Sequence, residues 1–362
     1  MARCVYSHVL SLHLVRIDCM KAHRICLLSL LTSVFLFSCA PTPQQIVLEK
    51  AVTLPVDSVS EKARHSTVRI VSWTGYGSGF FVAPDRIVTN IHVVARPGPI
   101  FAKLVDGKTI WAVEDVTAYD VKNDLVVLKI AGESTPLRLG DSDKVQTGEP
   151  IIAFGYPGGK YKVMPGVIAH SKEIFNWLRI KIDTLVGSSG GPVLNKDGQV
   201  IGIIVGYSDA FHSYAIPANV LKMLLAKSDS IESLVDWRKR DLIRASTYHV
   251  QGQKKYRVND YKEAITDFDK AIQLNPEIWM SYYNRGTAKV RLAEFAKKHG
   301  NVGQARELYQ AAIDDYTQTL KINPDSIRAY RNRGHAKEAL GPKEAAEADF
   351  EKAKELDQGV GY

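Results

Sequence analysis

The sequence pattern changes near Lys227, and this change constrains the fold more than any other feature of the chain. Up to that residue, short apolar runs alternate with glycine-containing turns, a pattern typical of β-strands. Beyond it, apolar residues recur at the spacing of amphipathic helices. A chain of 362 residues is also too long for a single hydrophobic core. We therefore expect an all-β domain over residues 64–228, a linker helix over 229–244 and an all-α domain over 245–358.

The helical part contains a repeat of small and aromatic residues. Gly252, Ala264, Phe268 and Ala271 return with the same spacings as Gly334, Ala346, Phe350 and Ala353. A middle copy starts at Gly286 and holds about 14 extra residues before Ala312. We expect lengthened helices around a longer turn in this second repeat. The alternative is a plain helical bundle in which the spacing is coincidental.

Three short motifs in the β part carry residues of one well-known chemistry. T-N-I-H ends at His92, N-D-L-V-V-L includes Asp124, and G-S-S-G-G-P includes Ser189. A serine hydroxyl becomes nucleophilic when an imidazole takes its proton, and a carboxylate fixes the tautomer of that imidazole. Each residue alone has a bland interpretation, as a core histidine, a turn aspartate or a loop serine. Together and in this order, they predict a serine protease.

The glycines around Ser189 fit the same chemistry. Gly187 can adopt a conformation in which its N–H points inward beside the N–H of Ser189, and together these amides could hold an oxyanion. No metal or organic cofactor is needed for this mechanism, and we expect none. The sequence contains no cluster of residues that would bind a metal.

The stretch from Ser66 to Lys227 resembles the trypsin-like peptidases of the bacterial HtrA/Deg kind. That resemblance implies two six-stranded β-barrels, with His92 and Asp124 on the first, Ser189 on the second and the active site between them. The helical part resembles tetratricopeptide repeats, with two antiparallel helices in each of three units. The peptidase resemblance rests on motifs that begin at the following positions: G-S-G-F-F-V at 77, V-T-N-I-H-V-V at 88, D-L-V-V-L-K-I at 124, L-G-D-S at 139, F-G-Y-P-G-G at 154, G-S-S-G-G-P-V at 187, V-I-G-I at 200 and A-I-P at 215.

The chain also departs from this resemblance. Ser188 precedes the predicted nucleophile, where HtrA proteases usually have Asn and digestive relatives have Asp, so we expect no activation by a buried salt bridge to a new N-terminus. We expect Ile203, Ile204 and Val205 to form an edge strand that pairs with substrate beside an apolar pocket. Asp183 is the alternative, as an acid selecting Lys or Arg. HtrA proteases usually carry a PDZ domain after the protease, and we find no such pattern here.

The first 38 residues resemble a lipoprotein leader. A basic segment that begins at Met20, a better start than Met1, precedes an apolar run ending in L-F-S-C at Cys39. We expect Cys39 to be lipidated, residues 39–63 to form a tether, and the protein to face the periplasm from the outer membrane, because Ala40 lacks a carboxylate. An ordinary secretory signal or a simple membrane anchor is the alternative.

Composition excludes other classes of function. All four cysteines lie at or before Cys39, so no disulfide can hold the domains together. The net charge is +8, but the leader supplies part of it, and no basic stripe interleaved with aromatic residues indicates nucleic-acid binding.

The first helices of the repeats offer a candidate partner groove. Asn284, Arg328 and Arg331 fall at positions expected to face it, where they would favour acidic or free-carboxylate segments. A solvated charged face is the equally open alternative.

These observations lead to one principal hypothesis and one alternative. The principal hypothesis is an envelope-located serine endopeptidase whose repeats recruit protein or peptide substrates, or a partner protein. The resemblance also implies a homo-oligomer formed through the N-terminal edge of the protease. The alternative is a catalytically idle chaperone or scaffold that binds through the repeats.

Overall fold

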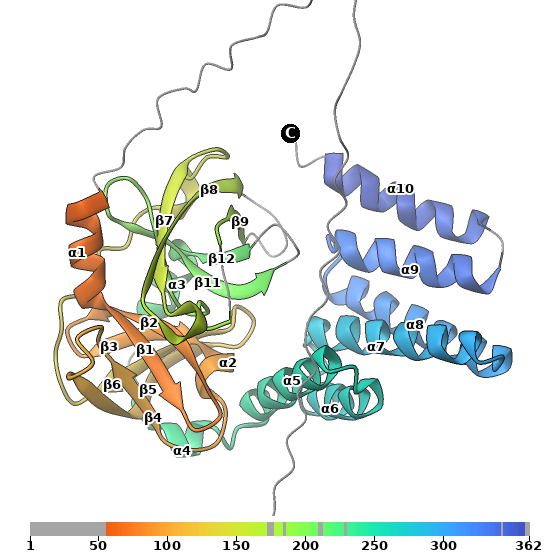
Figure 1. Ribbon diagram of the computed structural model, residues 1–362, viewed down its shortest axis with the longest axis horizontal. Helices are drawn as coiled ribbons and strands as arrows, with labels where there is room; N and C mark the ends of the chain where they lie inside the picture. The colour runs from red at the N-terminus through yellow and green to blue at the C-terminus, as the bar shows by residue number, and fades with distance from the viewer. Residues whose placement is uncertain are drawn as a thin grey trace, which may run out of the picture. The chain divides into compact units, whose positions relative to one another are not determined.

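The computed structural model describes residues 56–358, apart from 172–176, 184–185, 209–212, 228–229 and 342. Two closed six-stranded antiparallel barrels come first, and helices in antiparallel pairs follow (Figure 1). The predicted double barrel followed by an all-α repeat region is therefore confirmed.

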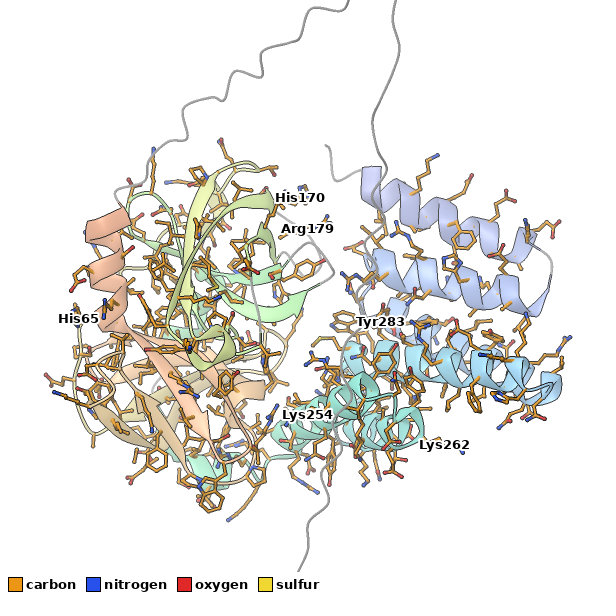
Figure 2. All side chains as sticks on the ribbon, viewed as in Figure 1. His65, His170, Arg179, Lys254, Lys262 and Tyr283 are labelled. Carbon is orange, nitrogen blue, oxygen red and sulfur yellow. The ribbon has the colours of Figure 1, made fainter. Side chains whose placement is uncertain are left out.

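The two barrels share one strand order. In the first, each strand pairs in the circular order β1-β2-β3-β6-β5-β4, and the second repeats this order as β7-β8-β9-β12-β11-β10. Side chains fill the interior of both barrels (Figure 2). The strands are β1 (Thr67–Ser72), β2 (Gly75–Ala83), β3 (Arg86–Asn90), β4 (Ile100–Lys103), β5 (Ile110–Asp120), β6 (Leu125–Ile130), β7 (Pro150–Gly155), β8 (Lys162–His170), β9 (Leu178–Lys181), β10 (Pro192–Leu194), β11 (Val200–Ser208) and β12 (Ser213–Pro217).

A third apolar cluster joins the barrels to each other. Phe80 and Leu125 of the first barrel pack in one buried cluster with Phe154 and Ile203 of the second. Helix α3 (Ala218–Leu225) adds Leu221 and Leu224 to this cluster. The two barrels are therefore fixed to a common core.

Part of the predicted tether is folded. Residues Val56–Ser66 form helix α1, whose Ala63 is fully buried and whose Val59 packs against the cluster shared by the two barrels. Because these two side chains lie four residues apart, they share one face of the helix. The tether prediction is thus wrong for 56–63, and the rest of it lies outside the described residues.

The predicted linker helix over 229–244 is also wrong. Glu232–Ser233 form the short strand β13 on β5, Leu234–Trp237 form helix α4, and the next helix begins only at Asp241. Leu234, Trp237 and Ile243 are buried in the core of the first barrel. The folded unit that contains the barrels therefore extends past residue 228, to Ile243.

Three helix pairs make up the repeats. Small residues allow close packing in the first and third pairs, because a Cβ on Gly252 or Gly334 would lie 2.7 or 2.6 Å from the ring of Phe268 or Phe350. The helices are α5 (Asp241–Arg257), α6 (Tyr261–Leu274), α7 (Trp279–Lys298), α8 (Val302–Ile322), α9 (Ile327–Leu340) and α10 (Glu344–Gln358).

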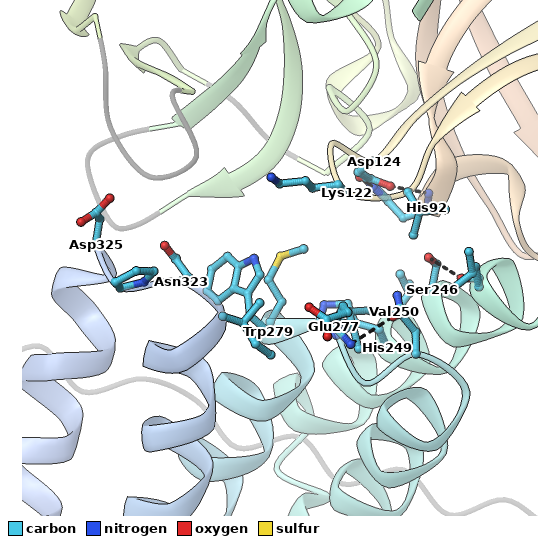
Figure 3. A pocket seen from close by; sticks show the side chains of 17 residues that line it. His92, Lys122, Asp124, Ser246, His249, Val250, Glu277, Trp279, Asn323 and Asp325 are labelled. Carbon is cyan, nitrogen blue, oxygen red and sulfur yellow. Dashed lines mark hydrogen bonds and ion pairs between the residues drawn. The ribbon is translucent and has the colours of Figure 1, made fainter.

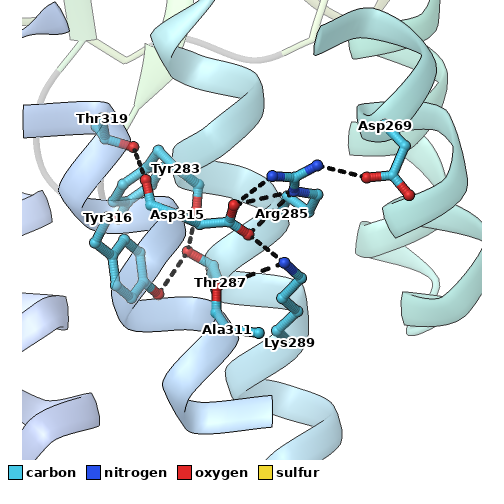
Figure 4. A network of polar contacts seen from close by, with 9 residues as sticks. All are labelled: Asp269, Tyr283, Arg285, Thr287, Lys289, Ala311, Asp315, Tyr316 and Thr319. Atoms are coloured by element: carbon cyan, nitrogen blue, oxygen red, sulfur yellow. Dashed lines mark hydrogen bonds and ion pairs between the residues drawn. The ribbon is translucent and has the colours of Figure 1, made fainter. Parts of the chain in front are cut away.

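Buried ion pairs connect the helices of each repeat. Asp315 of α8, 2% exposed, accepts hydrogen bonds from Arg285 and forms an ion pair with Lys289 at 2.7 Å, both from α7 (Figure 4). In the third pair, Arg333 and Lys337 contact Asp349 in the same way. In the first pair, Lys255 contacts Asp267 at 2.7 Å.

Candidate active site

The loop before β6 holds the carboxylate of Asp124 against His92. His92 lies in the short helix α2 (Ile91–Val94) directly after β3, and Asp124 ends the loop between β5 and β6. Asp124 has a φ of 54°, an uncommon conformation for a non-glycine residue. Its carbonyl accepts hydrogen bonds from the amide of Ile91 and from Asn90 Nδ2, at 3.1 and 3.0 Å. The backbone strain at Asp124 is thus offset by contacts with β3 and α2.

Both oxygens of the Asp124 carboxylate contact His92. Oδ2 lies 2.5 Å from Nδ1 of the imidazole, and Oδ1 accepts the backbone amide of His92 at 3.0 Å. The side chain of His92 is 21% exposed, and that of Asp124 is 12% exposed. A carboxylate at Nδ1 favours the tautomer with its proton on that nitrogen, which leaves Nε2 free to accept a proton.

Ser189 lies in the turn before β10. Its Oγ donates a hydrogen bond to the carbonyl of Val205 at 3.3 Å. Within the described residues, Ser189 makes no hydrogen bond to His92. Catalytic hydrogen bonds are often long or misaligned in a free enzyme, and rotation about the Cα–Cβ bond would release Oγ from Val205.

The conformation of Gly187 shapes the loop that contains the backbone amides of Gly187 and Ser189. Gly187 has a φ of 104°, and a Cβ there would lie 2.4 Å from the ring of Tyr76. Ser78 Oγ donates to the carbonyl of Gly187 at 2.7 Å and accepts the amide of Tyr156 at 2.9 Å. In the described part of the chain, the amides of Gly187 and Ser189 make no backbone hydrogen bond. Two free donors beside a hydroxyl are the elements of an oxyanion hole.

Comparison with known proteins agrees with this geometry. Residues 77–203 match the family described as trypsin-like peptidase domain, and residues 245–278 and 290–360 match tetratricopeptide repeats. This chain contains a trypsin-like peptidase domain. The strand order and the positions of His92, Asp124 and Ser189 described above belong to this domain.

Relatives of the peptidase domain are periplasmic proteases by name. A probable periplasmic serine endoprotease DegP-like of Hahella chejuensis is 37% identical over 158 residues, 40% of this chain and 33% of the relative. A protein of the same name from Chlamydia pneumoniae is 41% identical over 137 residues, 35% of this chain and 28% of the relative. The match thus spans about a third of the length of these curated relatives. The solved Rv3671c protease of M. tuberculosis, in its active form, is 26% identical with a TM-score of 0.43, covering 49% of this chain and 87% of that chain.

The edge-strand prediction for Ile203 and Ile204 is wrong. Strand β11 is paired on both sides there, because Ile203 lies opposite Pro192 of β10 and opposite Ile216 of β12. The side chains of Ile203, Ile204 and Val205 are at most 1% exposed, so they cannot line a substrate pocket. Regular pairing with β12 is interrupted between Ile204 and Ser208, and Val205 offers its carbonyl to Ser189 there.

Other predicted residues of the peptidase site lie as follows. Asp183 is exposed, and the adjacent residues 184–185 lie outside the described residues, so its role in specificity stays a prediction. Ser188 is fully buried, and its hydroxyl lies 4.0 Å from Met164 Sδ. A buried salt bridge at position 188 is impossible because a serine carries no charge.

A cavity of about 640 Å³ next to the candidate active site is lined by the repeats as well as by the peptidase domain. His92, Lys122 and Asp124 come from the barrel, whereas His249, Glu277, Trp279 and Asn323 come from the repeats (Figure 3). Sequence analysis missed these repeat residues, because only the tertiary structure brings them to His92. Their one local signal is the sequence Asn-Pro-acid, which occurs at 275–277 and again at 323–325.

The three residues of the predicted partner groove do not all line the same cavity. Asn284 and Arg328 line a second cavity of about 120 Å³, together with Trp177 and Tyr214 of the peptidase domain. Arg331 is exposed and does not line it. The recruitment role of these three residues stays a prediction.

Arg238 is a further residue that sequence analysis missed. Its Nε donates to the carbonyl of Val94, the last residue of the helix that carries His92, at 2.8 Å, and its Nη1 donates to Gly98 at 2.8 Å. Thr247 of α5 donates to the neighbouring carbonyl of Ala95 at 3.2 Å. The segment that leads into the repeats therefore holds the C-terminal end of α2.

Two other expectations concern the lipid anchor at Cys39 and the binding of a metal ion. Cys39 lies outside the described residues, so its lipidation stays a prediction. No helix in the described part of the chain has the length and apolar character needed to cross a membrane. Among the described residues, no three His, Cys, Asp or Glu side chains gather as metal ligands would.

Proposed function

We propose that this protein is a serine endopeptidase whose tetratricopeptide repeats recruit substrates or a partner in the cell envelope. The observation that carries the proposal is the contact of both Asp124 carboxylate oxygens with His92. The repeats support the recruitment role, because arrays of this kind bind extended peptides or partner helices.

The proposed mechanism uses these groups in order. Ser189 Oγ attacks the carbonyl carbon of the substrate while its proton passes to Nε2 of His92. The amides of Gly187 and Ser189 bind the negative oxygen that forms, and the Asp124 carboxylate stabilises the imidazolium. The imidazolium then gives its proton to the leaving amine, and the C–N bond breaks to leave an acyl-enzyme. Water, deprotonated by the same imidazole, releases the acid and restores Ser189.

A fluorophosphonate probe tests the central claim directly. Such a probe phosphonylates only an activated serine, so the purified protein should be labelled and its Ser189→Ala variant should not. Profiling the cleavage sites of the same protein would then define its specificity. Wild-type protein that stays unlabelled at neutral pH would favour the idle scaffold instead, for which the hydrogen bond from Ser189 to Val205 is the supporting observation.

The envelope location is a separate part of the proposal. It rests on the word periplasmic in the names of the relatives and on the lipoprotein-like sequence before Cys39. Two or three acyl chains on one residue give stable membrane anchoring. Cys39→Ser should therefore move the protein from the membrane fraction to the soluble fraction, whereas Ser38→Ala should leave it in the membrane. Membrane association of the Cys39 variant would contradict lipidation.

A further inference from the structure

The wall of the cavity opposite His92 and Asp124 consists of two corners of the repeat array. Residues Asn275, Pro276 and Glu277 precede α7, and Asn323, Pro324 and Asp325 precede α9. All but Pro276 line the cavity that also contains the two candidate catalytic residues (Figure 3). A peptide that occupies this cavity beside His92 and Asp124 would therefore contact the repeats.

The charged side chains on the repeat wall are acidic. Glu277 and Asp325 are both exposed, and neither carboxylate makes a hydrogen bond or an ion pair within the described residues. His249 of the same wall is buried and stays neutral near pH 7, because burial lowers its pKa to about 4. The barrel wall contributes Lys122 and the His92–Asp124 pair. Two free carboxylates thus face a cavity whose lining includes a single lysine and no arginine.

Apolar and aromatic side chains lie next to these carboxylates. Trp279 and Met280 line both cavities, so they form the boundary at which the two meet. The methylene stem of a lysine or arginine packs well on such side chains, and its cationic head is attracted to an indole face. The site therefore offers a surface for the stem and carboxylates for the head.

An amide without a partner adds an independent sign of a ligand. Asn323 is 4% exposed and lines the cavity, but its Nδ2 is buried and makes no hydrogen bond in the described part of the chain. Leaving a buried donor unpaired is unfavourable. After a small rotation of the side chain, a carbonyl of a bound peptide would satisfy this donor.

We propose that Glu277, Trp279, Asn323 and Asp325 form a subsite for a lysine or arginine side chain of an extended peptide, at a position flanking the scissile bond. The assignment deepens the proposed function, because it makes the repeats part of substrate selection. An acidic side chain would meet two carboxylates in this subsite and would be repelled.

Binding to an inactive variant tests this proposal separately from catalysis. Ser189→Ala protein, full length and labelled with a fluorophore, is applied to an array of peptides that carry Lys, Arg, Gln or Glu at one fixed position. We expect Lys and Arg peptides to bind about tenfold more tightly than the Gln peptides, which corresponds to 1.4 kcal/mol. Equal binding of Lys and Gln peptides, or preference for Glu, would overturn the subsite.

Matched variants locate the effect. Glu277→Gln combined with Asp325→Asn should remove most of the preference for Lys and Arg and leave the binding of Gln peptides unchanged. Lys122→Gln should strengthen the preference, because it removes the cation on the barrel wall. Glu307→Gln, an exposed carboxylate of α8 outside the cavity, is the control and should change nothing. A preference that survives the double variant would overturn the assignment.

Fluorophosphonate labelling of wild-type protein distinguishes failure of the two proposals. Labelling of Ser189 without any preference for basic peptides would leave the endopeptidase in place and remove the subsite. Binding of basic peptides that depends on Glu277 and Asp325, in a protein that the probe does not label, would keep the subsite and remove the endopeptidase.

Discussion

At the scale of single residues, the Asp124 carboxylate performs two tasks at once, because it accepts hydrogen bonds from the amide and from the imidazole of His92. Asp124→Asn keeps the shape but offers an N–H where Nδ1 needs an acceptor, so the imidazole adopts the wrong tautomer. We expect kcat to fall by about 10⁴-fold, as in comparable enzymes, with little change in thermal stability. Cleavage of a fluorogenic peptide and the melting temperature, measured together, check this. A variant that loses activity only because it unfolds would show a large drop in melting temperature instead.

His249 gives a second prediction at this scale. Burial lowers its pKa to about 4, and its Nδ1 lies 2.8 Å from Ser281 Oγ in the repeat interior. The unfolded chain, in which histidine has a pKa of about 6.5, binds more protons than the folded chain between these two values. The contribution of His249 to the free energy of unfolding is therefore fully present above pH 6.5. It is lost as the pH falls toward 4, and the total loss is about 3 kcal/mol.

Urea unfolding at pH 7.0, 6.0 and 5.0 measures this loss. His249→Gln cannot titrate, so its free energy of unfolding should fall less steeply over this range than that of wild type. His299→Gln removes an exposed histidine of the same array and should follow wild type. Equal slopes for all three proteins would show that His249 is accessible to protons in the folded state.

At the scale of elements, sequence predicts the helices well and the turns poorly. The extra residues of the second repeat lengthen α7 and α8, as expected, but the turn between them is not longer. It spans His299–Asn301, as the first turn spans Val258–Asp260. Each turn contains one left-handed residue, Gly300 or Asn259. The amide three residues past each helix, of Asn301 or Asp260, donates to a carbonyl in the last turn of that helix at 2.9 or 3.0 Å. This capping is local, but a helical pattern does not show where it will occur.

The ion pairs between repeat helices lead to a prediction at the same scale. Asp315→Asn removes the charge that pairs with Arg285 and Lys289, whose side chains are 19% and 18% exposed. Arg285 would keep its ion pair with Asp269, but Lys289 would lose its carboxylate partner, and we expect the free energy of unfolding to fall by about 3 kcal/mol. The adjacent Asp314→Asn, on the exposed face, should cost less than about 0.5 kcal/mol. Chemical denaturation of both variants provides the comparison, and similar losses in the two would mean that burial of the pair is unimportant.

At the scale of the whole molecule, the sequence shows the two domains but not how they depend on each other. The motifs around His92, Asp124 and Ser189 could be predicted because each is local and the catalytic chemistry fixes its residues. The edge-strand assignment of Ile203 failed because an apolar run does not reveal whether one side of a strand or both will be paired. The cavity residues Glu277 and Asn323 could not be predicted, because they approach His92 only through the packing of the chain.

The segment after residue 228 shows the same limit and supports the last prediction. Trp237 lies in the predicted linker, yet it is fully buried in the core of the first barrel, in edge contact with Tyr119 at 5.9 Å between ring centroids. One residue later, Arg238 binds the carbonyl of Val94 at the end of the His92 helix. Sequence alone does not reveal these contacts, because each partner lies more than a hundred residues earlier.

Trp237→Ala in the full chain should therefore lower the free energy of unfolding by about 3–5 kcal/mol, the usual cost of removing a buried tryptophan from a core. Val235→Ala is the matched control, since that side chain is 65% exposed two residues away. A chain that ends at Lys227 would lack Leu234, Trp237 and Ile243 from this core and Arg238 from the His92 helix, so we expect it to be unstable and unlabelled by fluorophosphonate. Urea midpoints and probe labelling of the three proteins decide the matter: a shortened chain as stable and as reactive as the full one would return residues 232–243 to the role of a simple linker.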